Sequence, residues 1–355
     1  MNYPHFPADC QSLLCQYLTP EIFDQLKDKE TPYGFTLADV IRSGVENPDS
    51  SIGVYAGDRE SYTLFAPLFD PIIQAYHGFL PRDQHRSHLE ATALPDITLD
   101  PEGEYVLSTR IRVGRNLADF PLGAGLNREQ REQVERKIIT ALGALEGDLA
   151  GAYYPLYDMD ASVQSALIAD HFLFREGDRF LEAAGLNRDW PQGRGIFHNH
   201  EKRFLVWVNE EDQLRIISMQ EGGNVQEVFD RLIRALAQLE QLLSFAWSEH
   251  LGYISSCPTN LGTAMRASVH IRLPQLAQHP NRLEEIVNYY HLQVRGKDGE
   301  HSTTHDPIFD ISNRRRLGIT EVEAVGEMMR GVDALIREER ALGSRLKKGF
   351  LSKKH

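Results

Sequence analysis

Alternating side chains mark the segment Tyr105-Val-Leu-Ser-Thr-Arg-Ile-Arg-Val113 as a β-strand. Successive side chains of a strand point to opposite faces of the sheet, so Arg110 and Arg112 share one face with Ser108. We expect the opposite face to pack in a core and the two guanidinium groups to point together away from it. That opposite face carries Tyr105, Leu107, Thr109, Ile111 and Val113.

Other strands and helices follow along the chain. Apolar runs predict three more strands, at residues 204–208, 214–219 and 267–273. Apolar residues at helical spacing predict five helices, at residues 128–145, 162–174, 225–243, 283–294 and 321–336. Strands interspersed with helices indicate an α/β or α+β domain.

The N-terminal part has a different pattern. Leucine stripes predict short helices over roughly the first 80 residues, interrupted by a turn-rich loop at residues 43–55. A polar stretch at residues 81–104, with Pro95 and Pro101, reads as a linker. We therefore divide the chain into a helical domain at residues 1–90, a larger domain at residues 91–342 and a basic tail at residues 343–355, which we expect to be frayed.

Composition narrows the class of protein. The formal net charge of −13 makes the chain a poor general binder of nucleic acid or of an anionic membrane. The longest apolar runs are too short to span a bilayer, and the N-terminus lacks the pattern of a secretory signal. Cys10, Cys15 and Cys257 fit neither a disulfide framework nor a zinc site, so we expect a cytosolic protein.

Common nucleotide-binding motifs are absent. The sequence contains no Gly-x-x-x-x-Gly-Lys-Ser/Thr, no Gly-x-Gly-x-x-Gly, and neither His-Arg-Asp nor Asp-Phe-Gly. A P-loop NTPase and an ordinary protein kinase are therefore excluded. If the chain binds a nucleotide, it uses another arrangement.

Arginines provide a candidate arrangement. A second strand around residues 266–273 places Arg266 and His270 on the face opposite Ala267, Val269 and Ile271. Arg215 lies in a third strand, and Arg295 follows the helix expected at residues 283–294. Guanidinium groups suit phosphate oxygens, and phosphoryl transfer requires clustered positive charge. Solvated faces of amphipathic strands are an equally good interpretation at this point.

Two carboxylates complement the arginines. Glu211 lies in a hairpin tip at residues 209–212, and Glu300 lies in a polar loop at residues 295–304. Both positions are compatible with plain solvent exposure. They are also compatible with a grip on a guanidinium substrate, whose pKa above about 12 requires that a proton be drawn away before the nitrogen attacks phosphorus.

Cys257 lies in the turn-rich segment Tyr253-Ile-Ser-Ser-Cys-Pro-Thr-Asn-Leu-Gly-Thr263. A lone cysteine is more often a small core residue, but this composition is not that of a core. Nearby positive charge would favour a thiolate, which would orient and stabilise a guanidinium.

These segments resemble the phosphagen kinases. The resemblance rests on Cys257-Pro-Thr-Asn-Leu-Gly-Thr263, Ser108-Thr-Arg-Ile-Arg112, Phe204-Leu-Val-Trp-Val-Asn-Glu-Glu-Asp212, the pattern Arg295-Gly-x-x-Gly-Glu300 and Asp310-Ile-Ser-Asn-Arg-Arg-Arg-Leu-Gly318, and it extends from about residue 10 to about residue 342. Within the family the chain is most similar to the arginine kinases. The resemblance implies an α+β protein, with a small all-α N-terminal domain and a larger domain whose antiparallel sheet is flanked by helices.

The resemblance also implies roles for individual residues. It assigns Glu211, Glu300 and Cys257 to the guanidino group, and the loop residues Ser50, Ser51, Ile52 and Tyr55 to the amino acid end of the substrate. It assigns ATP to Arg110, Arg112, His171, Arg215, Arg266, His270 and Arg295. Mg²⁺ would be held by phosphates and water rather than by the protein. A monomer is expected.

The implied activity is reversible transfer of the γ-phosphoryl of MgATP to the guanidino group of L-arginine, giving phosphoarginine and ADP. The loop at residues 49–55 resembles the short arginine-type loop, although Ser51 stands where glycine is common. The alternatives are a kinase for another guanidino compound, a kinase for arginines within proteins, or a silent arginine- or nucleotide-binding protein. The N-terminal helical domain argues against the protein-arginine kinases, which lack it.

Overall fold

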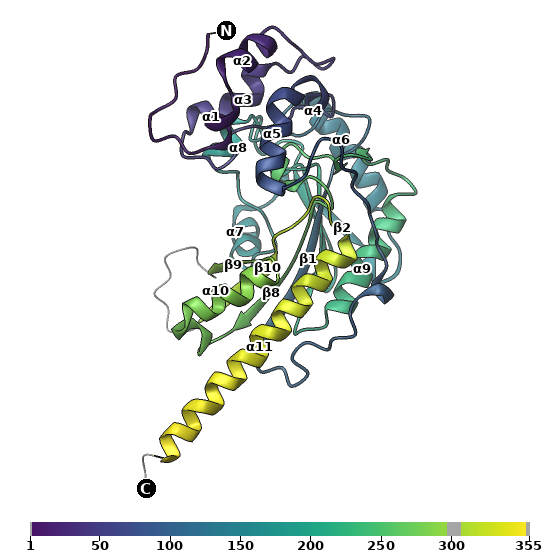
Figure 1. The fold of residues 1–355 in the computed structure, drawn as a ribbon. Coiled ribbons are helices and arrows are strands. Elements are labelled where there is room, and N and C mark those ends of the chain that lie inside the picture. The colour runs from purple at the N-terminus through teal and green to yellow at the C-terminus, as the bar shows by residue number, and fades with distance from the viewer. Residues whose placement is uncertain (1, 297–306, 353–355) are drawn as a thin grey trace.

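The computed structural model describes residues 2–296 and 307–352, and beyond Ser344 it describes only the course of the helix. Two bodies are visible in Figure 1, a cap of short helices at the top and a larger sheet domain below it. A long C-terminal helix projects from the sheet domain, away from the cap.

The cap is built from α1 (Leu13–Tyr17), α2 (Pro20–Leu26), α3 (Leu37–Glu46), α4 (Ser61–Leu64) and α5 (Ala66–His77). Side-chain caps start the first three helices: Ser12, Thr19 and Thr36 each accept a bond from a free backbone N–H. The buried side chains from Leu14 to Phe79 form one core cluster, which also takes in Ile254 and Cys257 of the larger domain.

The larger domain is an eight-stranded antiparallel sheet in the order β2-β3-β4-β5-β1-β8-β10-β9. Its strands are β1 (Val106–Arg115), β2 (Gly151–Pro155), β3 (Gly195–Asn199), β4 (Phe204–Val208), β5 (Leu214–Glu221), β8 (Met265–Arg272), β9 (Leu292–Gly296) and β10 (Ile308–Asn313). A separate two-stranded sheet pairs β6 (Trp247–Ser248) with β7 (Gly252–Tyr253). The expected α+β class, with a helical cap and an antiparallel sheet, is confirmed.

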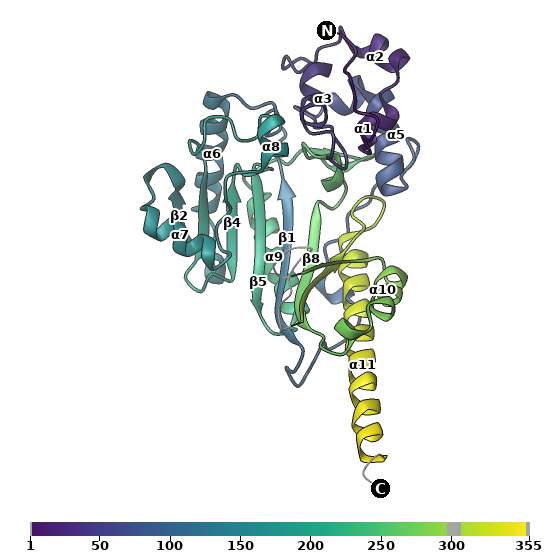
Figure 2. The ribbon, with the colours of Figure 1, turned by 90° about the vertical axis from the view of Figure 1, so that its left-hand side faces the viewer.

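Helices cover one face of the sheet (Figure 2). These are α6 (Arg128–Leu142), α9 (Val225–Leu239), α10 (Pro280–Tyr289) and α11 (Glu321–Ser352). Their apolar residues join Ile111, Val113, Ala267, Val269 and Ile271 in the main core, as alternation predicts. The opposite face carries the arginines, flanked by a smaller cluster that includes Leu205, Trp207 and residues of α7 (Ala161–Ala169). The short α8 (Arg179–Ala183) packs against α3 in the cap.

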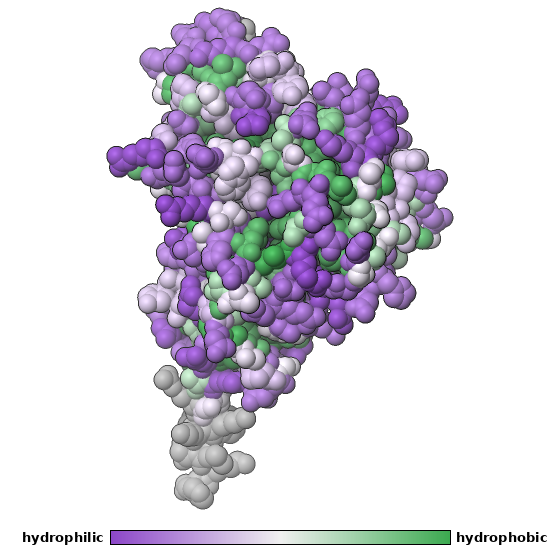
Figure 3. Space-filling model, turned by 90° about the vertical axis from the view of Figure 1, so that its right-hand side faces the viewer, coloured by the Kyte–Doolittle hydropathy of each residue, from purple (hydrophilic) through white to green (hydrophobic). Residues whose placement is uncertain are grey.

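The outer surface of the helix-covered part is mixed, with hydrophilic side chains around a green hydrophobic area (Figure 3). Among the described helices, none has the length and apolarity required to cross a bilayer.

Three local expectations are wrong. Leu107 is exposed rather than packed, because a bulge between Val106 and Ser108 reverses the alternation and buries Val106 instead. The helix expected at residues 283–294 ends at Tyr289, since His291 adopts a left-handed φ of 53°, and Arg295 lies on β9. The tail expected to be frayed continues α11 as far as Ser352.

The cysteine expectation is also wrong. Cys10 and Cys15 are paired in a disulfide that spans the start of α1, whereas Cys257 is free and buried. The two partners lie five residues apart, on either side of the capping residue Ser12. The cysteine argument for a cytosolic location therefore loses its support.

We propose to keep a domain boundary near residue 90. Phe79 belongs to the core cluster of the cap, whereas Ala91 belongs to the main core of the sheet domain. The boundary drawn at residue 342 falls inside α11 and marks no break in the structure.

Candidate active site

Strand pairing sets the arginines side by side on the open face of the sheet. Arg112 of β1 lies opposite Arg266 of β8, and on the other side of β1 Gly114 lies opposite Arg215 of β5. Further along these strands, Asp310 of β10 lies between His270 of β8 and Arg295 of β9. Residues that are far apart in the sequence thus become neighbours through the sheet register.

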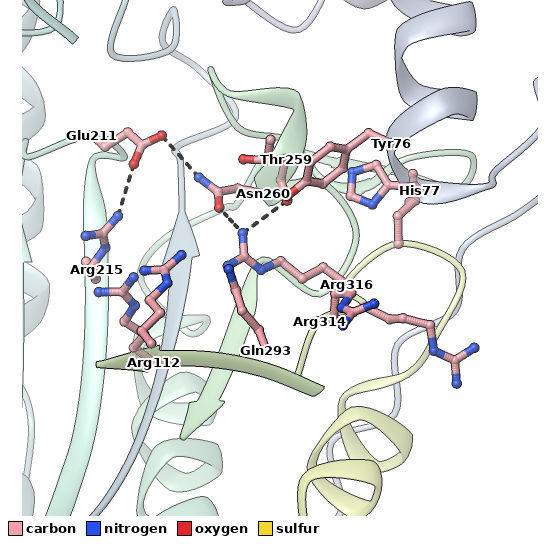
Figure 4. Close-up of a pocket in the computed structure, with 13 residues that line it drawn as sticks. Tyr76, His77, Arg112, Glu211, Arg215, Thr259, Asn260, Gln293, Arg314 and Arg316 are labelled. Carbon is pink, nitrogen blue, oxygen red and sulfur yellow. Dashed lines mark hydrogen bonds and ion pairs between the residues drawn. The ribbon is translucent and has the colours of Figure 1, made fainter. Parts of the chain in front are cut away.

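The arginines open into a cavity of about 530 Å³ between the sheet and the cap. Figure 4 shows guanidinium groups from several elements directed into it, with the Glu211 carboxylate at its edge. The cavity is lined by Tyr76, His77, Arg112, Glu211, Arg215, Thr259, Asn260, Gln293, Arg295, Arg314, Arg315, Arg316 and Leu317. The sequence-predicted residues Arg112, Arg215, Arg295 and Glu211 therefore meet in one place.

The arginines of this cluster carry more positive charge than the neighbouring carboxylates neutralise. Arg215 donates to Glu210 at 3.0 Å and to Glu211 at 3.2 Å, and Arg266 donates to Asp310 at 2.7 Å. The Nε atoms of Arg110 and Arg266 are buried without a hydrogen-bond partner. Burial, followed by the charges of Arg215 and Arg266, lowers the pKa of Arg110 to about 10. Buried donors and mutual repulsion of this kind fit a polyanion such as a triphosphate.

The indole ring of Trp207 lies beside the guanidinium groups of two of these arginines. The Cζ atoms of Arg110 and Arg215 lie 5.3 Å and 5.6 Å from its ring centroid, within range of a cation–π interaction. The indole N–H donates to the carbonyl of Phe172 at 2.7 Å. Trp207 therefore connects these two arginines to the segment that carries His171.

The predicted residue His270 lies within electrostatic range of His171 and of the arginine cluster. Burial lowers the pKa of His270, and the charges of Arg110, Arg266 and His171 lower it further, although Asp310 opposes them. His171 follows α7 with a left-handed φ of 61°. Both histidines are therefore on the same side of the sheet as the arginine cluster.

Glu211 is held by a short network. Its carboxylate accepts from Arg215, and from Asn260 Nδ2 at 3.2 Å. Arg316 in turn donates to Asn260 Oδ1 and to the carbonyl of Thr259, so the loop that carries Cys257 is tied to Glu211 (Figure 4). Burial raises the pKa of Glu211, while Arg215 opposes that shift. The network fixes the carboxylate at a position where it can meet a cation.

A second cavity of about 260 Å³ adjoins the first on the cap side. Glu211 and Thr259 line both cavities. The remaining walls are Ser50, Ser51, Ile52, Gly53, Tyr55, Asp178, Phe180, Leu181 and Cys257. The structure therefore brings together Glu211, Cys257 and the four loop residues that the sequence assigned to a substrate.

The cap holds this loop through backbone hydrogen bonds. The first N–H groups of α1, at Leu13 and Leu14, donate to the carbonyls of Ser51 and Ile52 at 3.1 Å. Gly44 N of α3 donates to Gly53 O at 3.1 Å. The loop conformation thus depends on the close approach of α3, which requires glycine at position 44.

Gly44→Ala should raise the KM for the guanidino substrate about tenfold, because its Cβ would lie 2.5 Å from Gly53 O and would push the loop away. The KM for ATP should stay within about twofold, because ATP is expected in the other cavity. Steady-state kinetics with each substrate varied in turn measure both values. Gly143→Ala is the matched control, since its nearest contact would be an ordinary 3.4 Å. Equal increases in both KM values would contradict a local effect.

Cys257 differs from expectation in its ionisation. Burial, followed by the charge of Glu211, raises the pKa of its thiol to about 12, although Thr259 opposes the shift. This shift favours a neutral thiol rather than the expected thiolate. Among the charges that act on the thiol, that of Glu211 is the largest, and Arg316 partly opposes it.

Two further expectations concern Glu300 and a bound metal ion. Glu300 lies outside the described residues. Within residues 2–296 and 307–352, no group of three or more His, Cys, Asp or Glu side chains is arranged to hold a metal ion.

Several residues of the site were missed by the sequence reasoning. Asn260 and Arg316 both lie inside segments that carried the family resemblance, and this was the available signal. Tyr76 lies in the last turn of α5 and reaches the large cavity from the cap, and Asp178 reaches the small cavity from the start of α8. Neither has a sequence pattern that separates it from a surface residue.

Comparison with known proteins agrees with this geometry. The family model of the ATP:guanido phosphotransferase C-terminal catalytic domain matches residues 133–342, and that of the N-terminal domain of the same family matches residues 8–74. An arginine kinase from Penaeus vannamei is 54% identical over 336 residues, which is 94% of each chain.

Solved structures give the same result. A lombricine kinase shares 43% identity with a TM-score of 0.92, covering 97% of this chain and 95% of its own. The duplicated taurocyamine kinase from Schistosoma mansoni shares 43% identity with a TM-score of 0.87, covering 92% of this chain and 46% of its own. The chain therefore belongs to the ATP:guanido phosphotransferases, the phosphagen kinase family, whose members transfer a phosphoryl group between ATP and a guanidino compound.

Proposed function

We propose that the protein transfers the γ-phosphoryl of MgATP reversibly to the guanidino group of free L-arginine. One observation carries the proposal: the cavity lined by arginines and the cavity lined by the Ser50–Tyr55 loop meet at Glu211. A triphosphate in the first cavity and an amino acid in the second would bring the phosphoryl group and the guanidino nitrogen together at that carboxylate.

The arginines bind the nucleotide in this proposal. Arg112, Arg215 and Arg295 reach the triphosphate directly from the cavity wall, while Arg110 and Arg266 supply charge from the neighbouring strands. His171 and His270 lie on the adenine and ribose side. Mg²⁺, held by phosphates and water, supplies further neutralisation of the phosphate charge.

Glu211 aligns the guanidinium for attack. As the guanidino nitrogen forms its bond to the γ-phosphorus, the bond from phosphorus to the β,γ-bridging oxygen breaks and ADP leaves. The guanidinium releases one proton, for which the Glu211 carboxylate is the acceptor within reach. Its raised pKa makes it a better acceptor than an exposed glutamate. Glu300 is proposed as the second carboxylate of the clamp.

The small cavity selects the rest of the substrate. In this proposal Ser50, Ser51, Ile52 and Tyr55, which line the cavity, meet the amino acid end of the substrate. Cys257 adjoins the guanidino end beside Glu211. We propose arginine rather than another guanidino compound because an arginine kinase shares 54% identity with this chain, whereas the lombricine and taurocyamine kinases share 43%. The monomeric state and the cytosolic location stay predictions.

ADP production measured by a coupled assay with L-arginine, lombricine, taurocyamine, glycocyamine and creatine tests the proposal. We expect kcat/KM for L-arginine to exceed that for every other compound by about 100-fold or more. A site that binds the polar groups of one substrate rejects compounds that lack them. A preference for lombricine or taurocyamine would overturn the assignment of arginine within the family. Phosphorylation of an unfolded protein in preference to the free amino acid would favour a protein-arginine kinase.

A further inference from the structure

One carboxylate of the small cavity has no part in the mechanism above. Asp178 lines that cavity together with the Ser50–Gly53 loop, Phe180 and Leu181. It lies at the start of α8, which packs against α3, and Ser43 Oγ donates to the carbonyl of Phe180 at 2.8 Å. Asp178 therefore belongs to the cap side of the cavity, along with the substrate loop.

The hydrogen bonds of Asp178 occupy only one of its two oxygens. As the N-cap of α8, its Oδ1 accepts from Phe180 N at 3.0 Å and from Leu181 N at 3.1 Å. Within the described residues, Oδ2 accepts no hydrogen bond and forms no ion pair. The capping bonds fix the carboxylate in place and leave its second oxygen available to a ligand.

No hydrogen bond or ion pair joins the Asp178 carboxylate to Arg179, although the charges of the two residues interact. The adjacent cation, Arg179, donates instead to Asp49, and to Asn47 at 3.1 Å. Tyr55 of the substrate loop lies within range of the Asp178 charge: burial raises the pKa of its hydroxyl most, and the charges of Cys257, Glu211 and Asp178 raise it further. The cavity therefore contains two separate negative groups, Glu211 on the sheet side and Asp178 on the cap side.

We propose that Asp178 is a specificity-determining residue that binds the α-ammonium group of the substrate. The inference rests on the proposed function, since it assumes that this cavity holds the amino acid end of a guanidino compound. A substrate with two cationic groups, one at each end of the cavity, matches the two carboxylates. A guanidino acid that lacks the ammonium group would bring only its own carboxylate towards Asp178 and would be repelled.

The test compares Asp178→Asn with the wild type on three substrates. Asparagine caps a helix as well as aspartate does, so the variant removes the charge and keeps the capping bonds. The KM for L-arginine should rise about tenfold, because a hydrogen bond to a charged group is lost, with kcat changed less than about twofold. The KM for agmatine, which keeps the amine but lacks the carboxylate, should rise as it does for L-arginine. The KM for 5-guanidinopentanoate, which is arginine without its α-amino group, should stay the same or fall.

Glu182→Gln is the matched control, because it removes a carboxylate from the same helix at an exposed position that does not line the cavity. It should change none of the KM values. Asp178→Ser, a second variant able to cap the helix, should reproduce Asp178→Asn, and melting temperatures should show that both variants fold. The KM for ATP should be unchanged throughout.

Each outcome decides between the two proposals. Equal changes in KM for L-arginine and 5-guanidinopentanoate, or no change in either, with an active wild type, would overturn the role of Asp178 and leave the proposed function standing. A wild-type enzyme inactive with L-arginine would overturn the proposed function and the α-ammonium assignment together.

Discussion

Replacing Glu211 with glutamine should lower kcat by at least about 100-fold while the protein stays folded. Glutamine has the same shape, and its amide can still hold Asn260, so the network of the loop persists. The amide carries no negative charge to align the guanidinium and cannot accept its proton. The coupled assay gives kcat, and a thermal melt shows whether the fold is kept.

Glu210→Gln separates catalysis from simple loss of an ion pair. Glu210 also pairs with Arg215 at 3.0 Å, but it does not line either cavity. Its replacement should change the KM for ATP by no more than a few-fold, because Arg215 keeps its bond to Glu211, and it should reduce kcat less than about tenfold. Retention of near wild-type kcat by the Glu211 variant would remove this carboxylate from the clamp.

Arg112→Met should change stability and activity in opposite directions. Burial, followed by the charges of Arg215, Arg110 and Arg266, lowers the pKa of Arg112, which means that the ligand-free fold disfavours its charge. Methionine has a similar length and no charge, so the free energy of unfolding should rise by about 1 kcal/mol. The kcat/KM for ATP should fall by about 100-fold or more, because one of the groups that neutralise the phosphates is lost.

Melting with and without ADP or tripolyphosphate measures both effects. A ligand that binds only the folded state raises its stability, and this gain should be smaller for the Arg112 variant than for the wild type. Arg136→Met is the control, because it removes one positive charge from an exposed position of α6, away from the sheet face that carries the cluster. A variant that is both less stable and fully active would contradict the view that Arg112 serves the nucleotide rather than the fold.

The opposite effects expected for Arg112→Met on stability and activity follow from the repulsion between arginines in the ligand-free protein. Three strands bring together arginines that repel one another, and only part of their charge is met by Glu210, Glu211 and Asp310. The packed apolar face of the same strands holds them in this arrangement. Binding a triphosphate would relieve the repulsion, so some of the strain of the free protein contributes to nucleotide affinity.

The sheet face on which a side chain lies was predictable where it depends only on the alternation of its own strand. The alternation of β1 and β8 correctly placed Arg110, Arg112 and Arg266 opposite the apolar side chains of the core. It failed at Leu107, because a bulge depends on how the neighbouring strand pairs and leaves no mark in the sequence of β1 itself. It also failed beyond Tyr289, where one left-handed residue at His291 ended a helix that apolar spacing would have continued.

The sequence by itself determined that strands and helices build an α/β or α+β domain, where the hairpin that carries Glu211 lies and which face each strand arginine occupies, since strand period and turn chemistry act over a few residues. Only the tertiary structure decided that Arg112 pairs with Arg266, that Glu211 stands between two cavities and that Asp178 faces the substrate loop. Periodicity assigns a side chain to a face but does not choose its neighbours. Strand order and the docking of the cap, which depend on the packing of segments distant in sequence, make that choice.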